Sequence, residues 1–579
     1  MTQRPARLRG LVGVASTTVV GLALSAQPAG ADDVADWATL STGFAACAPA
    51  ALGTTLTADI DSGGADLVIP SGCDARIDLA GHELRVQSVR IASGTQFTLT
   101  DSSPGNAGQL HADARSSTDP LAGVDVLGTF YVDDARVTAF GSEHGSGIGA
   151  GTTHNSGLII VDRGTITATG GDSGAGIGPR LDGVGGRIEL LGATVTANGG
   201  GGHPGVGGRY GPAIMIESTS LNATGGVNGS GIQGPLSVND SVVVAHGGRD
   251  GAGIGGSNPN GTAWDVQILG PELGGFGPST VTAVGGDRAS GIGGGSDSPG
   301  GTLVVGTGGN VVHATGGAGA TAIGGGLDGI GGEIAILAGS TVTAIGGAGS
   351  PSVLGSAWPE GPFGILEVAG TLHLPQGQLL LPRSDDDVPG VPHVLVEHGG
   401  RILGTEADPT TGAQLVGDGW IENQGVIALT EDLVLGGNTI EVTTNNFDVR
   451  FDAAGGTPVA STRVFAPTWD TGYRGPLPTS SRTGFTFSGW LTAAGPLTAD
   501  AALAPLASSP VLATAQWSRG TGPAAGTSGN GVGHGSSPGA ATLPVVGAAP
   551  NLIGIVVALL AAGAGGVLLR RRGTTHSVS

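Results

Sequence analysis

One short pattern recurs eight times between about residue 135 and residue 355, and it constrains the fold more than any other feature of the chain. Each copy has an apolar residue two places before an Ala, then a Gly-rich stretch, then Gly-Ile-Gly or a close variant. The Ala positions are Ala139, Ala168, Ala197, Ala223, Ala245, Ala283, Ala314 and Ala344. A second apolar residue stands nine positions after each Ala, although successive copies are 22 to 38 residues apart. A disordered Gly-rich chain has no need of a fixed offset, so the pattern predicts an ordered repeat.

Apolar and polar residues alternate around each Ala, as in Ile166-Thr167-Ala168, and this alternation is typical of short β-strands. Each repeat has room for about three such strands, at 175–178, 187–191 and 194–198 in one copy. A unit of this kind has one apolar face and can bury it only against the next unit. Stacking the units about 4.8 Å apart gives a parallel β-helix. We expect the recurring Ala and Gly residues at its tight corners.

The same alternation continues beyond the clearest repeats. We expect final, less regular coils at Ile365–Val368, Gln378–Leu381, His393–Val396 and Val426–Leu429. Upstream, Asp78–Leu84 and Phe97–Asp101 resemble the opening coils of pectate-lyase-like proteins. The sequence therefore predicts an all-β chain whose β-helix covers residues 55–443, most clearly 135–355.

Composition excludes several classes of function. The 579 residues include 115 Gly, and 24 basic residues stand against 46 acidic ones, for a net charge of −22. A chain this acidic repels a polyanion, so we expect no nucleic-acid partner. All the basic residues are Arg. The absence of Lys from the sequence excludes a phosphate-loop lysine and a Schiff-base lysine.

The length variation lies between Gly-Ile-Gly and the next strand, and insertions at such a place extend loops on one side of a solenoid. The longest connection runs from Ile254 to Val281. It carries our candidate ligand-binding residues, which are Asn258, Asn260, Trp264 and Asp265, followed by Glu272 and Phe276. A Trp beside amides and a carboxylate suits stacking on a sugar ring. The alternative is that Trp264 covers an apolar edge of the β-helix.

The carboxylates give no catalytic or metal-binding pattern. The candidates are Asp133, Asp134, Asp182, Asp250, Asp297 and Asp328, and most of them stand in Gly-rich turns where Asp favours the turn itself. Asp133 and Asp134 are close to Arg136, and surface pairing explains that group. We therefore expect no catalytic residue, no metal site and no cofactor. The run Asp385–Asp387 leaves weak Ca²⁺ binding open against a solvated loop.

Both ends of the chain read as targeting segments. Residues 1–31 have the order of a signal peptide: Arg residues, an apolar run, and Ala29-Gly30-Ala31 as a cleavage site. Leu552–Leu569 is uncharged and long enough to span a membrane, and Arg570–Arg572 would hold its end in the cytoplasm. The Gly-, Ser- and Pro-rich residues 519–542 read as a flexible linker.

The segment before the apolar span, within 543–579, is similar to a known sorting signal. Leu543, Pro544, Val546 and Gly547 resemble the LPxTG motif of Gram-positive surface proteins, in which a sortase cuts after Thr and joins the chain to peptidoglycan. Val546 stands at the Thr position, so the sequence leaves open whether attachment is covalent. Because the chain is expected to be exported and has two Cys, we expect a disulfide between Cys47 and Cys73 that closes an N-terminal cap at 32–54.

Residues 447–518 differ from the repeat region. The segment Gly484-Phe485-Thr-Phe487-Ser-Gly-Trp490 resembles the Listeria–Bacteroides repeat, also called the internalin B-repeat. This resemblance implies a small β-grasp-like module that acts as a spacer or protein-contact unit, with Phe485, Phe487 and Trp490 in its core.

Together these features predict a noncatalytic, cell-surface anchored protein that acts in adhesion or glycan binding through loops on one side of a β-helix. Its expected partners are a glycan or another surface ligand, the membrane through the C-terminal helix, and a sortase with peptidoglycan if the motif functions. Two alternatives stay open: a polysaccharide lyase or hydrolase of the pectin-degrading type, and a passive structural component of the envelope.

Overall fold

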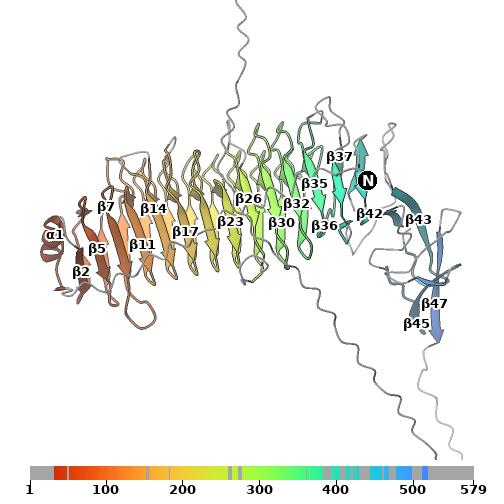
Figure 1. Ribbon diagram of the computed structural model, residues 1–579, viewed down its shortest axis with the longest axis horizontal. Coiled ribbons are helices and arrows are strands. Elements are labelled where there is room, and N and C mark those ends of the chain that lie inside the picture. The colour runs from red at the N-terminus through yellow and green to blue at the C-terminus, as the bar shows by residue number, and fades with distance from the viewer. Residues whose placement is uncertain are drawn as a thin grey trace, which may run out of the picture. The chain divides into compact units, whose positions relative to one another are not determined.

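The computed structural model describes residues 32–47, 51–151, 155–180, 183–257, 264–270, 277–359, 361–381, 393–397, 399–404, 413–417, 421–423, 425–429, 444–459, 462–467, 477–493, 495–497 and 511–519. The described chain is almost entirely β, and the predicted repeats form a parallel β-helix. From β2 to β34, each full coil gives one strand to each of three parallel sheets, here named A, B and C in chain order, so sheet neighbours there are three strands apart in sequence. Figure 1 shows the coils following one another along the solenoid.

The strand bounds define the three sheets. Sheet A contains β1 (Asp32–Val34), β2 (Ala51–Leu56), β5 (Asp74–Asp78), β8 (Gln96–Thr100), β11 (Thr129–Asp133), β14 (Leu158–Asp162), β17 (Ile188–Leu191), β20 (Ile214–Glu217), β23 (Leu236–Asn239), β26 (Asp265–Ile268), β29 (Thr302–Val305), β32 (Glu333–Ile336), β35 (Ile365–Val368), β38 (Val394–Val396) and β41 (Ile421–Asn423). The parallel part of sheet B contains β3 (Ile60–Asp61), β6 (Glu83–Val86), β9 (Gln109–Asp113), β12 (Arg136–Phe140), β15 (Thr165–Thr169), β18 (Thr194–Asn198), β21 (Ser220–Thr224), β24 (Val242–His246), β27 (Thr280–Val284), β30 (Val311–Thr315), β33 (Thr341–Ile345), β36 (Thr371–His373), β39 (Arg401–Leu403) and β42 (Val426–Leu429). Sheet C contains β4 (Leu67–Ile69), β7 (Val89–Ile91), β10 (Val124–Val126), β13 (Ile148–Gly149), β16 (Ile177–Gly178), β19 (Val206–Gly207), β22 (Ile232–Gln233), β25 (Ile254–Gly255), β28 (Ile292–Gly293), β31 (Ile323–Gly324) and β34 (Leu354–Gly355). A further parallel pair, β37 (Gln378–Leu381) and β40 (Gln414–Gly417), belongs to the last coils.

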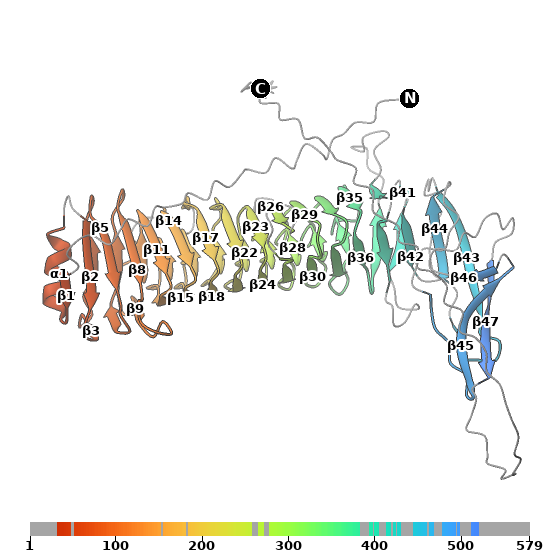
Figure 2. The same cartoon turned by 60° about the horizontal axis from the view of Figure 1, so that its bottom comes forward.

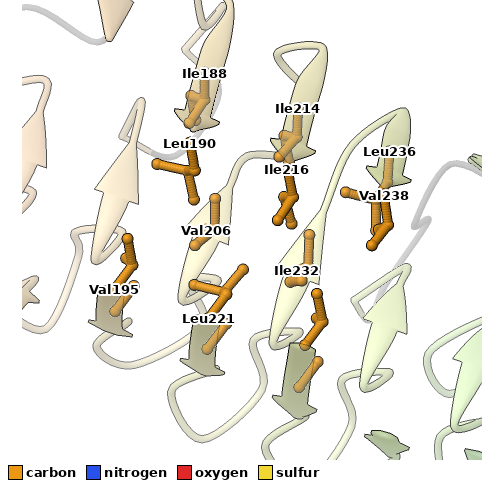
Figure 3. Close-up of a cluster of buried hydrophobic side chains, with 14 of the residues drawn as sticks. Ile188, Leu190, Val195, Val206, Ile214, Ile216, Leu221, Ile232, Leu236 and Val238 are labelled. Carbon is orange, nitrogen blue, oxygen red and sulfur yellow. The ribbon is translucent and has the colours of Figure 1, made fainter. Parts of the chain in front are cut away.

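In-register columns of apolar side chains form the core. Figure 3 shows side chains from all three sheets meeting inside the coils, among them Ile188 and Leu190 of β17, Val195 of β18 and Val206 of β19. Strand pairing places the eight repeat Ala residues in one unbroken column, and each is at most 1% exposed. The expectation that these Ala residues occupy corners was therefore wrong. They are inward-facing residues at the fourth position of the sheet B strands, and each packs in the core between the Ala residues of the neighbouring coils.

The Gly residues do lie at the corners, where neighbouring coils pack backbone against backbone. A Cβ atom on Gly176 would lie 2.6 Å from the carbonyl oxygen of Gly205 on the next coil, which is too close for any side chain. Gly178 has a φ of +141°, a conformation that residues with a side chain rarely adopt. A side chain at these positions would push neighbouring coils apart, so close stacking of the coils requires Gly there.

The last repeat departs from the sequence pattern by one residue. The fixed offset of nine predicts that Val353 continues the sheet C column. The structure instead pairs Ile323 with Leu354, ten residues after Ala344. The extra residue lies in the turn between β33 and β34, where a single insertion changes the offset without breaking either ladder.

A buried polar ladder replaces apolar residues at the corner between sheets A and B. Ala193 N donates to Thr219 Oγ1 (3.1 Å), and Thr219 N donates to Ser241 Oγ (3.1 Å). The series continues from Ser241 N to Ser279 Oγ (3.3 Å) and from Ser279 N to Asn310 Oδ1 (2.8 Å). Each side-chain oxygen thus accepts from the backbone of the preceding coil, so these buried backbone donors are satisfied.

A helix and a disulfide close the N-terminal end. Helix α1 (Trp37–Ala45) begins after Asp36, whose carboxylate accepts from Thr39 N at 2.9 Å, and it buries Leu40 and Phe44. The structure joins Cys47 to Cys73 by a disulfide with a Cα–Cα distance of 5.4 Å. The cap covers the open end of the core, which would otherwise expose apolar residues and a sheet edge.

In the described part of the downstream segment, five strands enclose a separate small core. They are β43 (Thr444–Asp452), β44 (Thr462–Pro467), β45 (Phe485–Thr492), β46 (Gly495–Leu497) and β47 (Val511–Arg519). Trp490 is 2% exposed and packs at 4.7 Å from the Phe451 ring centroid and 5.2 Å from that of Phe487. Phe485 lies outside this buried cluster, and the Arg482 guanidinium lies 4.2 Å above its ring. The expectation of a core role for Phe485 was therefore wrong.

Within the part of the chain that the structure describes, no helix has the length and apolar character needed to cross a membrane. The expected signal peptide with Ala29 and Ala31, the linker, the motif Leu543–Gly547 and the apolar span Leu552–Leu569 all lie outside the described residues.

The Ala column predicts a sharp difference between inward and outward substitutions. Ala197→Leu adds three carbon atoms to a column with no room for them, so it should destabilise the protein by about 1–3 kcal/mol. Thr196→Leu, on the adjacent outward position, should change stability by less than about 0.5 kcal/mol. Thermal unfolding followed by circular dichroism measures both. Equal melting temperatures for the two variants would contradict the assigned register.

Candidate functional site

The structure divides the longest predicted loop between two corners of the β-helix. Strand β26 interrupts it, so the chain passes from β25 of sheet C to β26 of sheet A and only then to β27 of sheet B. The expectation that all inserted residues share one loop was therefore wrong. Trp264 and Asp265 lie at the start of β26. Asn258, Asn260, Glu272 and Phe276 lie outside the described residues.

Trp264 is packed against the β-helix and only partly accessible. A Cβ atom on Gly211 would lie 3.1 Å from Trp264 Cη2, so the ring reaches back over an earlier coil. Its Nε1 is buried and makes no hydrogen bond within the described part of the chain. Asp265 is exposed at the first position of β26. This geometry agrees better with the alternative interpretation, in which Trp264 covers an edge of the solenoid.

Large exposed apolar residues gather on the connections from sheet C to sheet A. We call this side the C-to-A edge and define it by Val184 (58% exposed), Tyr210 (51%), Ile330 (38%) and Trp358 (46%). Val184 and Tyr210 form an isolated parallel β-bridge, and the Arg209 guanidinium lies 5.9 Å from the Tyr210 ring centroid. Sequence reasoning missed these residues, although each is an isolated large apolar residue in a Gly- or Pro-containing turn. Val184 and Tyr210 lie on neighbouring coils, as do Ile330 and Trp358, so they form two small apolar areas on this edge.

An open hollow of about 510 Å³ lies near the N-terminal end of sheet B. Asp61, Arg85, His111, Asp113 and Arg115 are among the residues that line it. Arg115 Nη2 lies 2.6 Å from Asp113 Oδ2, and its guanidinium lies 4.1 Å from the centroid of the Phe140 ring. Asp113 accepts hydrogen bonds from Arg115, and these bonds hold the pKa of the Asp113 carboxyl below its usual value.

Both Arg side chains in this hollow have a carboxylate partner. Arg85 Nη2 lies 2.9 Å from Glu83 Oε2, and Arg115 pairs with Asp113. Paired charges on an exposed surface do not attract an anion strongly, and a carboxylate that is paired with Arg is a poor general base. The paired charges do place donors and acceptors side by side, as a neutral polyhydroxyl ligand requires.

The one carboxylate–Arg group that the sequence singled out is held by a different Arg. Arg163, from the next coil, approaches Asp133 Oδ1 at 2.8 Å, Asp134 Oδ2 at 3.3 Å and Asp162 Oδ1 at 3.7 Å. The expected neighbour, Arg136, is exposed on β12. Burial raises the pKa of Asp133, and burial together with nearby carboxylates raises the pKa of Tyr131 to about 12. One guanidinium shared by three carboxylates explains this group as a structural link between coils.

The remaining Asp residues show no convergence on a reactive centre. Arg288 Nη2 lies 2.6 Å from Asp250 Oδ1, which pairs this buried carboxylate across coils. Asp297 and Asp328 have positive φ values of 58°, as expected for turn residues. No group of three metal-ligating side chains occurs among the described residues. Asp182 and the run Asp385–Asp387 lie outside them.

Comparison with protein-family models, with curated proteins and with solved structures gives no match for this chain.

The raised pKa of Asp133 predicts a local pH dependence of stability. A carboxyl whose pKa is higher in the folded state binds its proton more tightly there, so its ionisation lowers stability as the pH rises above its ordinary value of 3.8. Asp133→Asn lacks this ionisation. Its melting temperature relative to wild type should therefore increase from pH 3.5 towards neutral pH, measured by parallel thermal scans. A difference that stays constant or falls over this range would contradict the burial argument.

Proposed function

We propose that this chain is a noncatalytic protein of the cell surface that binds glycans through the C-to-A edge of its β-helix. The observation that carries the proposal is the set of exposed apolar side chains on that edge, above all Tyr210 and Trp358. Aromatic rings that are half exposed on a rigid scaffold offer flat apolar surfaces with polar groups nearby, which suits a sugar ring.

The spacing of these rings favours a chain-like ligand. Tyr210 follows β19 and Trp358 follows β34, which lie five coils apart in sheet C. At about 4.8 Å for each coil, the two connections are separated by about 24 Å along the solenoid. A polysaccharide lying along the edge would contact both residues at once, and two weak contacts on one chain increase the apparent affinity.

Two other interpretations make different demands on the chain. A pectin-degrading lyase or hydrolase needs carboxylates and an Arg or an acid available to the substrate. The Asp residues described above are instead paired with Arg163 or Arg288, or hold turns, which favours a binding protein. A passive envelope component would need no exposed aromatic residues, so Tyr210 and Trp358 favour binding over this alternative as well.

Anchoring at the cell surface remains part of the proposal. It rests on the sequence: a signal peptide at 1–31, a linker at 519–542, a sorting-like motif at 543–547 and the apolar span Leu552–Leu569. The downstream module, β-grasp-like by its resemblance to the Listeria–Bacteroides repeat, would act as a spacer. The membrane, a sortase and peptidoglycan are then the partners at the anchored end, and weak Ca²⁺ binding at Asp385–Asp387 stays an open element of the proposal.

A glycan array probed with the exported chain, residues 32–542, tests the binding proposal. Tyr210→Ala and Trp358→Ala should each weaken any glycan that binds by about tenfold, since loss of one stacking contact costs roughly 1–1.5 kcal/mol. Val227→Ala is the matched control, because Val227 is 65% exposed but lies on the connection from sheet B to sheet C. Binding that is unaffected at Tyr210 and Trp358 would contradict the proposed edge.

Further variants locate the ligand on the β-helix. Arg115→Ala reports on the hollow near the N-terminal end, and Trp264→Ala reports on the residue expected from the sequence. A loss confined to Arg115→Ala would place the ligand in the hollow. An array without binding, together with unchanged adhesion of cells that lack the protein, would favour the passive envelope role.

The anchoring proposal predicts a gain of function. Val546→Thr restores the residue after which sortases cut in the LPxTG family, so it should raise the wall-linked fraction of the protein in a Gram-positive host. A cell-wall hydrolase releases the wall-linked protein and detergent extracts the membrane-held protein, so the ratio of the two amounts measures covalent attachment. Equal fractions for both chains would show that position 546 does not limit covalent attachment.

A further inference from the structure

The outward side chains of sheet B form a polar face along seven consecutive coils. We call it the threonine face and define it as the first, third and fifth residues of β15, β18, β21, β24, β27, β30 and β33. Thr occupies slightly more than half of these positions. The strands Thr165-Ile166-Thr167-Ala168-Thr169 and Thr341-Val342-Thr343 illustrate the pattern. The inward residues between them belong to the buried columns, so the Thr side chains face solvent.

Strand register turns this face into a two-dimensional lattice. Thr165 pairs with Thr194, Thr167 pairs with Thr196, and the ladder continues without a register shift as far as β33. Neighbouring coils are about 4.8 Å apart, and alternate residues of one strand are about 6.7 Å apart. Figure 2 shows β15, β18, β24 and β30 following one another on the same side of the β-helix.

The side chains on this lattice are stiff. Thr is branched at Cβ and strongly restricted about χ1, so its methyl and hydroxyl groups keep fixed places. Ten of the 21 positions are not Thr: five are Val or Ile, two are Asn, two are His and one is Ser, and β24 has no hydroxyl group. The Val and Ile residues, among them Val244 and Val284, are branched at Cβ like Thr and keep a methyl group at their positions. The face therefore presents its groups in an ordered array before any partner arrives, and little side-chain entropy is lost on contact.

The composition of the threonine face restricts the partner that fits it. None of its positions carries Asp, Glu or Arg, so it offers nothing to a charged polymer. It has no Trp, Tyr or Phe, so it lacks both the platforms on which sugars stack and the anchors typical of protein interfaces. Two His residues, His246 and His313, are its only ring side chains. A rigid array of hydroxyl and methyl groups best fits an uncharged partner whose hydrogen-bonding groups are also regularly spaced, such as a surface of ordered water molecules.

We propose that the threonine face binds ice. The oxygen rows of hexagonal ice repeat at distances close to both spacings of the Thr lattice, so successive hydroxyl groups can hydrogen-bond into the same surface. The methyl groups between the hydroxyl groups offer no hydrogen bonds, so they leave the intervening water molecules in the arrangement of the ice surface. This face is separate from the C-to-A edge, and the proposal does not depend on glycan binding.

Ice binding has a direct measurement. The purified exported chain, residues 32–542, should inhibit ice recrystallisation and, when fluorescently labelled, should coat particular planes of a single ice crystal. Thr196→Tyr and Thr282→Tyr each place a bulky ring in the middle of the lattice and should abolish coating of the crystal. Ser237→Tyr makes the same change on the outer face of sheet A and should leave it intact. Circular dichroism and thermal unfolding verify that all three variants are folded.

The two functional groups of Thr can be separated at one position. Thr196→Val keeps the methyl group and the Cβ branching that fixes χ1, whereas Thr196→Ser keeps the hydroxyl group but loses this restriction. If the rigidity of the array matters more than one hydrogen bond, the Ser variant should lose more activity than the Val variant. Absence of ice activity in the wild-type chain would overturn the proposal, as would full activity of folded Thr196→Tyr. Binding to crystalline cellulose or chitin through this face, without ice binding, would also overturn it and identify a polysaccharide surface as the partner.

Discussion

Every feature of the β-helix depends on coils that stack in register through backbone hydrogen bonds. Because coils are separated by the spacing of a parallel sheet, each inward position must repeat the volume of its neighbour above and below. The unbroken column of Ala residues in sheet B and the Ile-rich column in sheet C meet this requirement. The Gly residues at the corners allow the backbones of successive coils to approach closely enough for the ladders to form.

The same constraint produces two distinct outward surfaces. In sheet B, register aligns the outward residues of successive coils, so Thr side chains from six of the seven strands of the threonine face form an extended lattice. On the C-to-A edge the connections differ in length and sequence from coil to coil, and isolated residues such as Tyr210 and Trp358 project from them. A solenoid can therefore carry a regular surface and an irregular one side by side on one rigid core.

Sequence periodicity predicted much of the fold. Strands at Ile365–Val368, Gln378–Leu381 and Val426–Leu429 lie where alternation placed them, because a period of two directly reflects which side chains face the core. The sequence was less informative about the site. Strand β26 is short and lies inside an irregular segment, so its presence between two corners was not expected. Likewise, Arg163 reaches the Asp133 group from another coil, and only the stacked geometry reveals such a contact.

Hydrogen exchange of the repeat region, read by mass spectrometry on residues 32–542, tests the central claim most directly. Amides of the Gly-rich turns donate to carbonyl groups of the next coil, as Gly176 N donates to Pro204 O and Gly205 N to Ser230 O at 3.1 Å. In-register stacking predicts slow exchange of these Gly amides, with protection close to that of the adjacent strands. Exchange of the segments around 170–178 and 199–207 at the rate of an unfolded chain would contradict the β-helix and both surfaces assigned to it.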